Sequence, residues 1–312
     1  MNRAPVEASA PGKVILFGEH AVVHGRPAIA VPVAELRATA RLEPAPADSG
    51  LIIVAADLGV RTSLRQASAG QPLARAARLA LAHMGASEPD AICTIRSALP
   101  IAGGLGSGAA VTAALIRGLA SYLDHAISPG ELSRLVFEVE KLHHGTPSGI
   151  DNTVVVYEAP IFFQRDQPIE RLTLGAPLPL VIADTGIPSA THAAVALVRS
   201  ARKREPKRYE ALFDQIAGIV LQARIAIEEG EVASLGPLMD RNQALLSDMG
   251  VSSPELEALI STARLAGARG AKLSGAGRGG NMIALVQPGH QDSVAQALLA
   301  AGAVHVFATT VT

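Results

Sequence analysis

The chain has 312 residues, of which 49% are hydrophobic and 18% charged, and its formal net charge is −1. This composition is typical of a globular protein with one large or two medium domains, and it argues against a nucleic-acid-binding surface. The single cysteine, Cys93, excludes an internal disulfide. No segment resembles a membrane span or a secretory signal, so we expect a cytoplasmic protein that does not enter membranes.

The first third of the chain contains short apolar or alternating runs that predict β-strands. The clearest alternation is at residues 36–42, where Leu and Ala are separated by Arg and Thr, as in a half-buried strand. A helix is predicted between the later strands, where Pro72 opens an Ala- and Leu-rich run. Strands are predicted at residues 14–17, 28–33, 36–42, 51–55 and 92–95, and the helix at residues 72–84.

Helices dominate the rest of the chain. At Ser128, Pro129 and Glu131 the sequence predicts a capped helix start, because Ser can cap, Pro suits the first turn and Glu lies three residues on. Strands and helices follow each other without strict alternation, which favours an α+β protein with lobes at residues 1–170 and 171–312. Further helices are predicted near residues 109–123, 191–202, 208–229, 231–249 and 254–266, and strands at 178–183, 281–286 and 305–309.

Residues 100–110 are the most informative stretch. Gly103, Gly104 and Gly106 precede an Ala-rich helical run, and glycines allow a backbone to bend sharply around a ligand. The positive end of the following helix attracts an anion, so the loop is a candidate phosphate site, although a simple tight turn has the same pattern. It is not a P-loop, since no lysine follows. The glycines at 275–280 precede an apolar strand rather than a helix, which argues against a Rossmann site.

Two further segments concentrate charged side chains. Lys13 begins an apolar strand, and Glu19, His20 and His24 follow in one short loop, where they need partners or a ligand to offset desolvation. A solvated lysine is the ordinary alternative.

The second segment contains two carboxylates. Glu140 lies off the polar face of its helix, and Asp151 follows a Gly/Pro/Ser turn. This pair suits Mg²⁺ with a phosphate, because Mg²⁺ binds oxygen ligands and needs few carboxylates when phosphates supply the rest. An aspartate that only bonds its own turn is the alternative.

Three segments, residues 10–25, 100–110 and 272–285, resemble the signature motifs of the GHMP kinases in order and spacing. The sequences Gly-Glu-His-Ala-Val-Val-His-Gly and His-Gly-Thr-Pro-Ser-Gly-Ile-Asp-Asn resemble the mevalonate kinase branch of that superfamily. The likeness implies an N-lobe like domain 2 of ribosomal protein S5, a ferredoxin-like C-lobe, and ATP-dependent phosphorylation of the mevalonate 5-hydroxyl with Mg²⁺. The turn at 275–280 would shape the site.

The resemblance also implies individual roles. Asp151 would be the catalytic carboxylate and Lys13 would polarise the hydroxyl, both touching the substrate. Glu19 and His20 would help to hold mevalonate, and Glu140 would bind Mg²⁺, with Ser107 as a further ligand. The nucleotide phosphates would contact the loop residues Pro100, Ala102, Gly103, Gly104, Leu105, Gly106, Ser107, Gly108 and Ala109.

One position departs from the family pattern, because Gly108 stands where a second serine is usual and normally meets the metal. Two alternatives stay open: another GHMP kinase, such as a phosphomevalonate kinase, and a nucleotide-binding regulator without activity. The first is disfavoured because the N-terminal loop lacks the Arg and Lys that a phosphorylated substrate would need. The presence of Lys13, Glu140 and Asp151 argues against the second. A homodimer is compatible with the sequence.

Overall fold

The computed structural model describes residues 3–100, 104–144 and 147–312. The chain forms two compact units, each assembled from separate segments. The first comprises Met1–Gly12, Glu35–Pro100 and Gly106–Glu158, and the second comprises Lys13–Ala34, Ile101–Leu105 and Ala159–Thr312. The long strands β1 (Val6–Phe17) and β2 (Ala28–Pro44) therefore contribute residues to both units.

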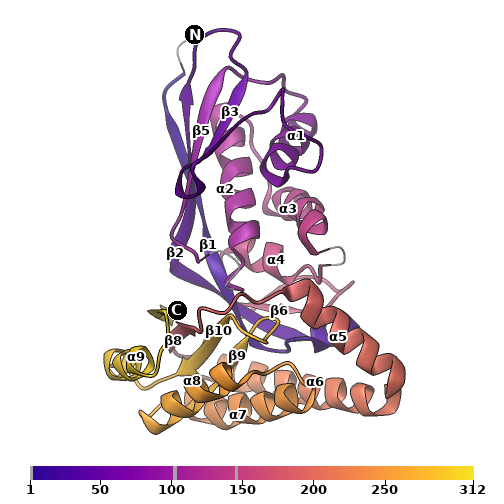
Figure 1. Ribbon diagram of the computed structural model, residues 1–312, viewed down its shortest axis with the longest axis vertical. Coiled ribbons are helices and arrows are strands. Elements are labelled where there is room, and N and C mark those ends of the chain that lie inside the picture. The colour runs from indigo at the N-terminus through magenta and orange to yellow at the C-terminus, as the bar shows by residue number, and fades with distance from the viewer. Residues whose placement is uncertain (1–2, 101–103, 145–146) are drawn as a thin grey trace. The chain divides into compact units, whose positions relative to one another are not determined.

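The first unit combines a sheet with helices. Its strands follow the order β4-β3-β5-β2, and β1 also pairs with β2. The strands β3 (Leu51–Ala55) and β5 (Ala91–Ser97) are parallel, whereas β4 (Val60–Ser63) is antiparallel to β3. The helices pack against one another beside this sheet (Figure 1): α1 (Pro72–Met84), α2 (Ser107–Tyr122), α3 (Pro129–His144) and α4 (Ile150–Tyr157).

Local sequence signals explain several of these elements. Helix α1 has the predicted bounds, with Pro72 in its first turn and Gly85 at its C-terminal cap with a φ of 60°. The predicted start of α3 is confirmed: the Glu131 amide donates to Ser128 Oγ at 3.3 Å, and the Ser128 amide donates to Glu131 Oε2 at 2.9 Å. These reciprocal bonds satisfy two amides that the helix itself leaves unbonded.

The two strands predicted at 28–33 and 36–42 are a single strand. In β2, Ala28 to Ala30 pair with β6 (Ile161–Phe163), and Ala38 to Pro44 pair with β5. The predicted alternation is confirmed in its second half, where Leu36, Ala38, Ala40 and Leu42 are buried. The strand changes neighbours along its length, so its two halves carry different burial patterns.

The second unit contains a four-stranded antiparallel sheet in the order β11-β8-β10-β9. Helices α5 to α8 connect β8 to β9, and α9 connects β10 to β11, which is the connectivity of a ferredoxin-like fold. The strands are β8 (Leu178–Asp184), β9 (Gly270–Ser274), β10 (Asn281–Leu285) and β11 (His305–Val311). The helices are α5 (Thr191–Arg204), α6 (Pro206–Glu229), α7 (Val232–Asp248), α8 (Pro254–Leu265) and α9 (Gln291–Ala300).

The core of the second unit lies between this sheet and its helices. Every residue of β8 is buried, and α9 packs on β11. Helices α7 and α8 pack on β9 (Figure 1). The short strand β7 (Glu170–Arg171) pairs with β6. The structure is thus α+β, as predicted. Over the described residues, no helix combines the length and apolar character needed to cross a membrane.

Candidate active site

The glycine-rich loop leads into helix α2, as the sequence predicts. Gly104 and Gly106 have positive φ values of 84° and 73°, which a glycine adopts without steric cost. Gly106 is the N-terminal cap of α2, and Ser107 is its first residue. The first amides of a helix have no partner within it, so this end of α2 can bind an anion. Of the predicted phosphate-binding residues, Ala102 and Gly103 lie outside the described residues.

In the first unit, the start of α2 faces the predicted metal-binding carboxylate. Helices α2 and α3 pack together, and Glu140 on α3 is only 3% exposed. A Cβ built on Gly108 would lie 3.0 Å from Glu140 Oε1. The position at which the sequence departs from the family pattern is therefore next to the carboxylate that was predicted to bind the metal.

Asp151 follows the Gly/Pro/Ser turn as expected, and the structure places it in the first turn of α4. Gly149, with a φ of 97°, is the N-terminal cap of this helix. A carboxylate in the first turn is stabilised by the helix dipole. The neighbouring Asn152 is buried and donates to Ser133 Oγ at 2.8 Å, which fixes α4 against α3.

In the second unit, Lys13 contacts the glycine-rich loop. Its amide donates to the Leu105 carbonyl at 2.9 Å, and its Nζ donates to the Gly104 carbonyl at 3.1 Å. The side chain is 3% exposed, so it is not a solvated surface lysine. Lys13 thus ties the loop to the second half of β1.

Glu19 is fully buried and forms an ion pair with Lys272 of β9, a residue that the sequence reasoning did not single out. Lys272 Nζ also donates to the Leu273 carbonyl at 2.6 Å. Burial raises the pKa of the Glu19 carboxyl, and the Lys272 ammonium opposes that rise. Burial likewise lowers the pKa of Lys272, opposed by Glu19. The sequence signal that could have identified Lys272 is its position at the start of the third motif, in a run of otherwise small or apolar residues.

His20 is held in an uncommon backbone conformation, with a φ of 59°. Its Nε2 lies 2.9 Å from the Ala276 carbonyl, and because a carbonyl only accepts, Nε2 carries the proton and donates it. Burial lowers the pKa of His20, which favours the neutral ring. Its Nδ1 is then a hydrogen-bond acceptor.

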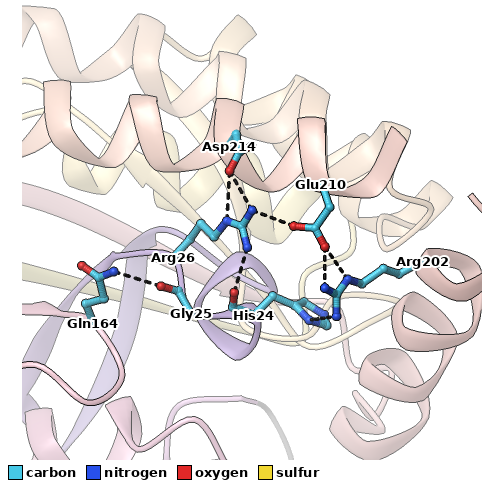
Figure 2. Close-up of polar contacts among 7 residues, drawn as sticks. All are labelled: His24, Gly25, Arg26, Gln164, Arg202, Glu210 and Asp214. Carbon is cyan, nitrogen blue, oxygen red and sulfur yellow. Dashed lines mark hydrogen bonds and ion pairs between the residues drawn. The ribbon is translucent and has the colours of Figure 1, made fainter. Parts of the chain in front are cut away.

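His24 belongs to a different cluster from Glu19 and His20. Figure 2 shows it beside Arg202, whose guanidinium lies 3.5 Å from His24 Nδ1, while Arg26 bridges Glu210 and Asp214 of α6. The ring also stacks on Phe213, with centroids 4.4 Å apart. Burial, followed by the Arg202 charge, lowers the pKa of His24 to about 4. Contacts with Arg202 and Phe213 thus offset the loss of solvation of the His24 ring.

The single cysteine, Cys93, is fully buried in β5. Burial raises the pKa of its thiol to about 12. It therefore stays protonated and is no nucleophile.

Similarity to known proteins extends over most of this chain. Residues 72–159 match the model of the GHMP kinases N terminal domain, and residues 223–304 match that of the GHMP kinases C terminal domain. The mevalonate kinase of Pyrococcus abyssi is 36% identical over 317 residues, covering 95% of this chain and 93% of the relative. The chain belongs to the GHMP kinases. The mevalonate kinase of Pyrococcus horikoshii is also 36% identical, with 96% and 93% covered.

A solved structure supports the same placement of this GHMP kinase. The crystal structure of mevalonate kinase from L. major in complex with R-mevalonate superposes with a TM-score of 0.87. It is 31% identical, and the match covers 100% of this chain and 97% of that one. The likeness therefore extends over both units.

Two residues of this GHMP kinase, Glu140 and Ser107, could contribute to holding a divalent metal ion. Glu140 of α3 is a buried carboxylate close to Gly108 in the first turn of α2, and Ser107 offers a hydroxyl on the same turn. The described residues contain no group of three or more His, Cys, Asp or Glu side chains that could hold a metal. Mg²⁺ bound together with phosphates generally uses only one or two carboxylates and keeps several waters.

Proposed function

We propose that this GHMP kinase transfers the terminal phosphoryl group of ATP to the 5-hydroxyl of mevalonate, giving 5-phosphomevalonate in the route to isoprenoids. The observation that carries the proposal is the similarity to proteins named mevalonate kinase over nearly the whole chain. The small-molecule partners are then ATP and mevalonate.

The family resemblance supports a division of labour among the predicted residues. The glycine-rich loop at residues 100–109 holds the phosphates through backbone amides at the start of α2. Glu140, with Ser107, holds Mg²⁺, which when bound neutralises charge on the phosphate oxygens. Phosphoryl transfer depends mostly on positioning and charge stabilisation, so fixed backbone and buried side chains suit it.

Two residues are assigned to act on the substrate hydroxyl that accepts the phosphoryl group. Asp151, at the start of α4, accepts the hydroxyl proton, and Lys13 stabilises the charge that develops on the oxygen. Glu19 and neutral His20 contact the polar groups of mevalonate. Neither supplies the extra positive charge that a substrate already carrying a phosphate would need, which favours mevalonate over phosphomevalonate.

A coupled assay of ADP release tests the proposal. The wild-type protein is incubated with ATP and Mg²⁺ and, in separate reactions, with mevalonate, phosphomevalonate, homoserine or galactose. We expect release that depends on mevalonate, with the product mass of one added phosphate. Faster turnover of phosphomevalonate would replace the assignment by the neighbouring kinase activity, and no release with any alcohol would indicate a regulator without activity.

A further inference from the structure

The third motif of this GHMP kinase, residues 272–285, contacts residues 15–20, the segment that carries Glu19 and His20. Side chains at alternate positions of β9 point the same way, and both Lys272 and Ser274 contact this segment. Ser274 Oγ accepts from the Ile15 amide at 3.0 Å and donates to the Ile15 carbonyl at 3.2 Å. The segment is thus fixed from β9 before any substrate is present.

The ion pair between Lys272 and Glu19 differs from the other ion pairs of the described chain. Both of its side chains are 0% exposed, whereas every other pair for which the structure gives exposures has side chains at least 20% exposed. Moving both charged groups out of water costs more free energy than their attraction provides, unless the remaining lone pairs also form hydrogen bonds.

Those lone pairs are not all satisfied. Glu19 Oε1 bonds to Lys272, but Glu19 Oε2 is buried and has no hydrogen-bond partner among residues 3–100, 104–144 and 147–312. A buried carboxylate oxygen in this state is costly, and native structures generally complete such groups. If this ion pair served only stability, apolar side chains of the same volume would stabilise the fold as well or better. The incomplete pair therefore indicates a missing donor.

We propose that Lys272 is a positioning residue for the alcohol substrate: it orients Glu19 so that Oε2 accepts a hydrogen bond from a substrate hydroxyl. Lys272 itself does not touch the substrate. This inference rests on the proposed function and names how one of its substrate contacts is built. An acceptor-only carboxylate favours a hydroxyl donor and repels an anionic group, so the same oxygen discriminates between an alcohol and a phosphate ester.

The pair also sets the charge state of Glu19. The positive groups that act on Glu19 are Lys272 of β9 and Lys13 of β1, with Lys272 the stronger. Without Lys272, burial raises the pKa of Glu19 further, and the carboxyl protonates at a higher pH than in the wild type. A protonated Oε2 no longer accepts the hydroxyl in the same way.

A double-mutant cycle tests the inference with Lys272→Met, Glu19→Gln and the combined variant. We expect Lys272→Met to raise KM for mevalonate by about tenfold, as for a lost charge-assisted hydrogen bond, while KM for ATP changes by less than about twofold. In the Glu19→Gln background, Lys272→Met should change KM for mevalonate little, because it acts only through Glu19. In Lys272→Met, kcat/KM for mevalonate should rise with pH where the wild type is flat.

Arg264→Met is the matched control. Arg264 pairs with Asp240 at 2.7 Å and donates to the Ala271 carbonyl at 2.9 Å, next to Lys272 on β9, and no described contact joins it to Glu19. We expect this variant to lose stability with an unchanged KM for mevalonate. If Lys272→Met raises both KM values along with a similar loss of stability, the pair is only structural.

Two further outcomes overturn the inference. An equal effect of Lys272→Met with and without Glu19 contradicts action through Glu19. If Lys272→Met alone fails to fold, KM for mevalonate is compared between the combined variant and Glu19→Gln. A difference between these two KM values overturns the inference. Wild-type protein inactive on mevalonate would instead refute the proposed function, and the cycle is measured with whichever alcohol the wild type phosphorylates.

Discussion

Replacing Gly108 by serine tests the metal site at the position where the chain departs from its family. Gly108 lies in the first turn of α2 with a φ outside the left-handed region, so a side chain there meets no backbone strain. Its Cβ would lie 3.0 Å from Glu140 Oε1, and the carboxylate must move by a few tenths of an ångström. Since Glu140 Oε1 ends a flexible side chain, we expect the fold to tolerate this change.

The expected magnitude follows from the exchange of ligands. A serine hydroxyl would replace one metal-bound water, a difference worth about 1 kcal/mol, or about fivefold in the Mg²⁺ concentration that gives half the maximal rate. Gly108→Ala is the matched control, because it adds the same Cβ beside Glu140 without a hydroxyl. It should leave that concentration unchanged or raise it.

The assay titrates Mg²⁺ at saturating ATP and mevalonate for the wild type, Gly108→Ser and Gly108→Ala. The reasoning predicts a lower midpoint for serine alone. Three equal midpoints with full activity would refute the placement of the metal beside position 108, and Glu140 would then lose its role as well. A lower midpoint with both variants would show that moving Glu140, rather than adding a ligand, improves binding.

The remaining predictions concern three other positions. Asp151→Asn should lower kcat by about 10²-fold or more with little change in KM for ATP, and more than about a tenth of wild-type kcat would exclude a general-base role. Lys13→Met and Lys13→Arg should both be severely impaired in kcat, because the wide guanidinium cannot replace the compact ammonium bonded to Gly104; full activity of the arginine variant would contradict this. The free energy of unfolding should fall as the pH drops from about 6.5 to about 4, because the pKa of His24 is about 4 when folded and 6.5 otherwise, so the unfolded chain binds the proton first. Urea unfolding at pH 7 and pH 5 measures this change. His24→Phe, which keeps a stacked ring, should reduce the pH dependence of the free energy of unfolding. The same pH dependence in this variant would show that another group causes it.

Strong local signals made much of the fold predictable. The bounds of α1 and the capped start of α3 follow from proline, glycine and serine at defined positions, and β3 from a short apolar run. Helix α4 was missed because its eight residues are rich in β-branched side chains and are set by packing rather than by propensity. The boundary near residue 170 stays a prediction.

The candidate site was predictable only where one segment carries its own chemistry. The glycine-rich loop and the buried Glu140 could be found from spacing, because a helix face and a loop are local features. The pairing of Glu19 with Lys272 joins residues 253 positions apart, and no local pattern links them. For the same reason, the stacking of His24 on Phe213 could not be distinguished from a ligand contact until the second unit was assembled.

A different physical constraint acts on each residue of the Gly18-Glu19-His20 turn. A Cβ on Gly18 would lie 2.6 Å from the Cα of Ala28, and its φ of 100° also requires glycine. The charge of Glu19 is matched by Lys272. The positive φ of His20 costs on the order of 1–3 kcal/mol and is held by contacts of the surrounding structure, among them the bond to Ala276. A turn that is constrained at all three positions, yet leaves Glu19 Oε2 without a hydrogen bond in the described chain, is organised around a group that the protein itself does not supply.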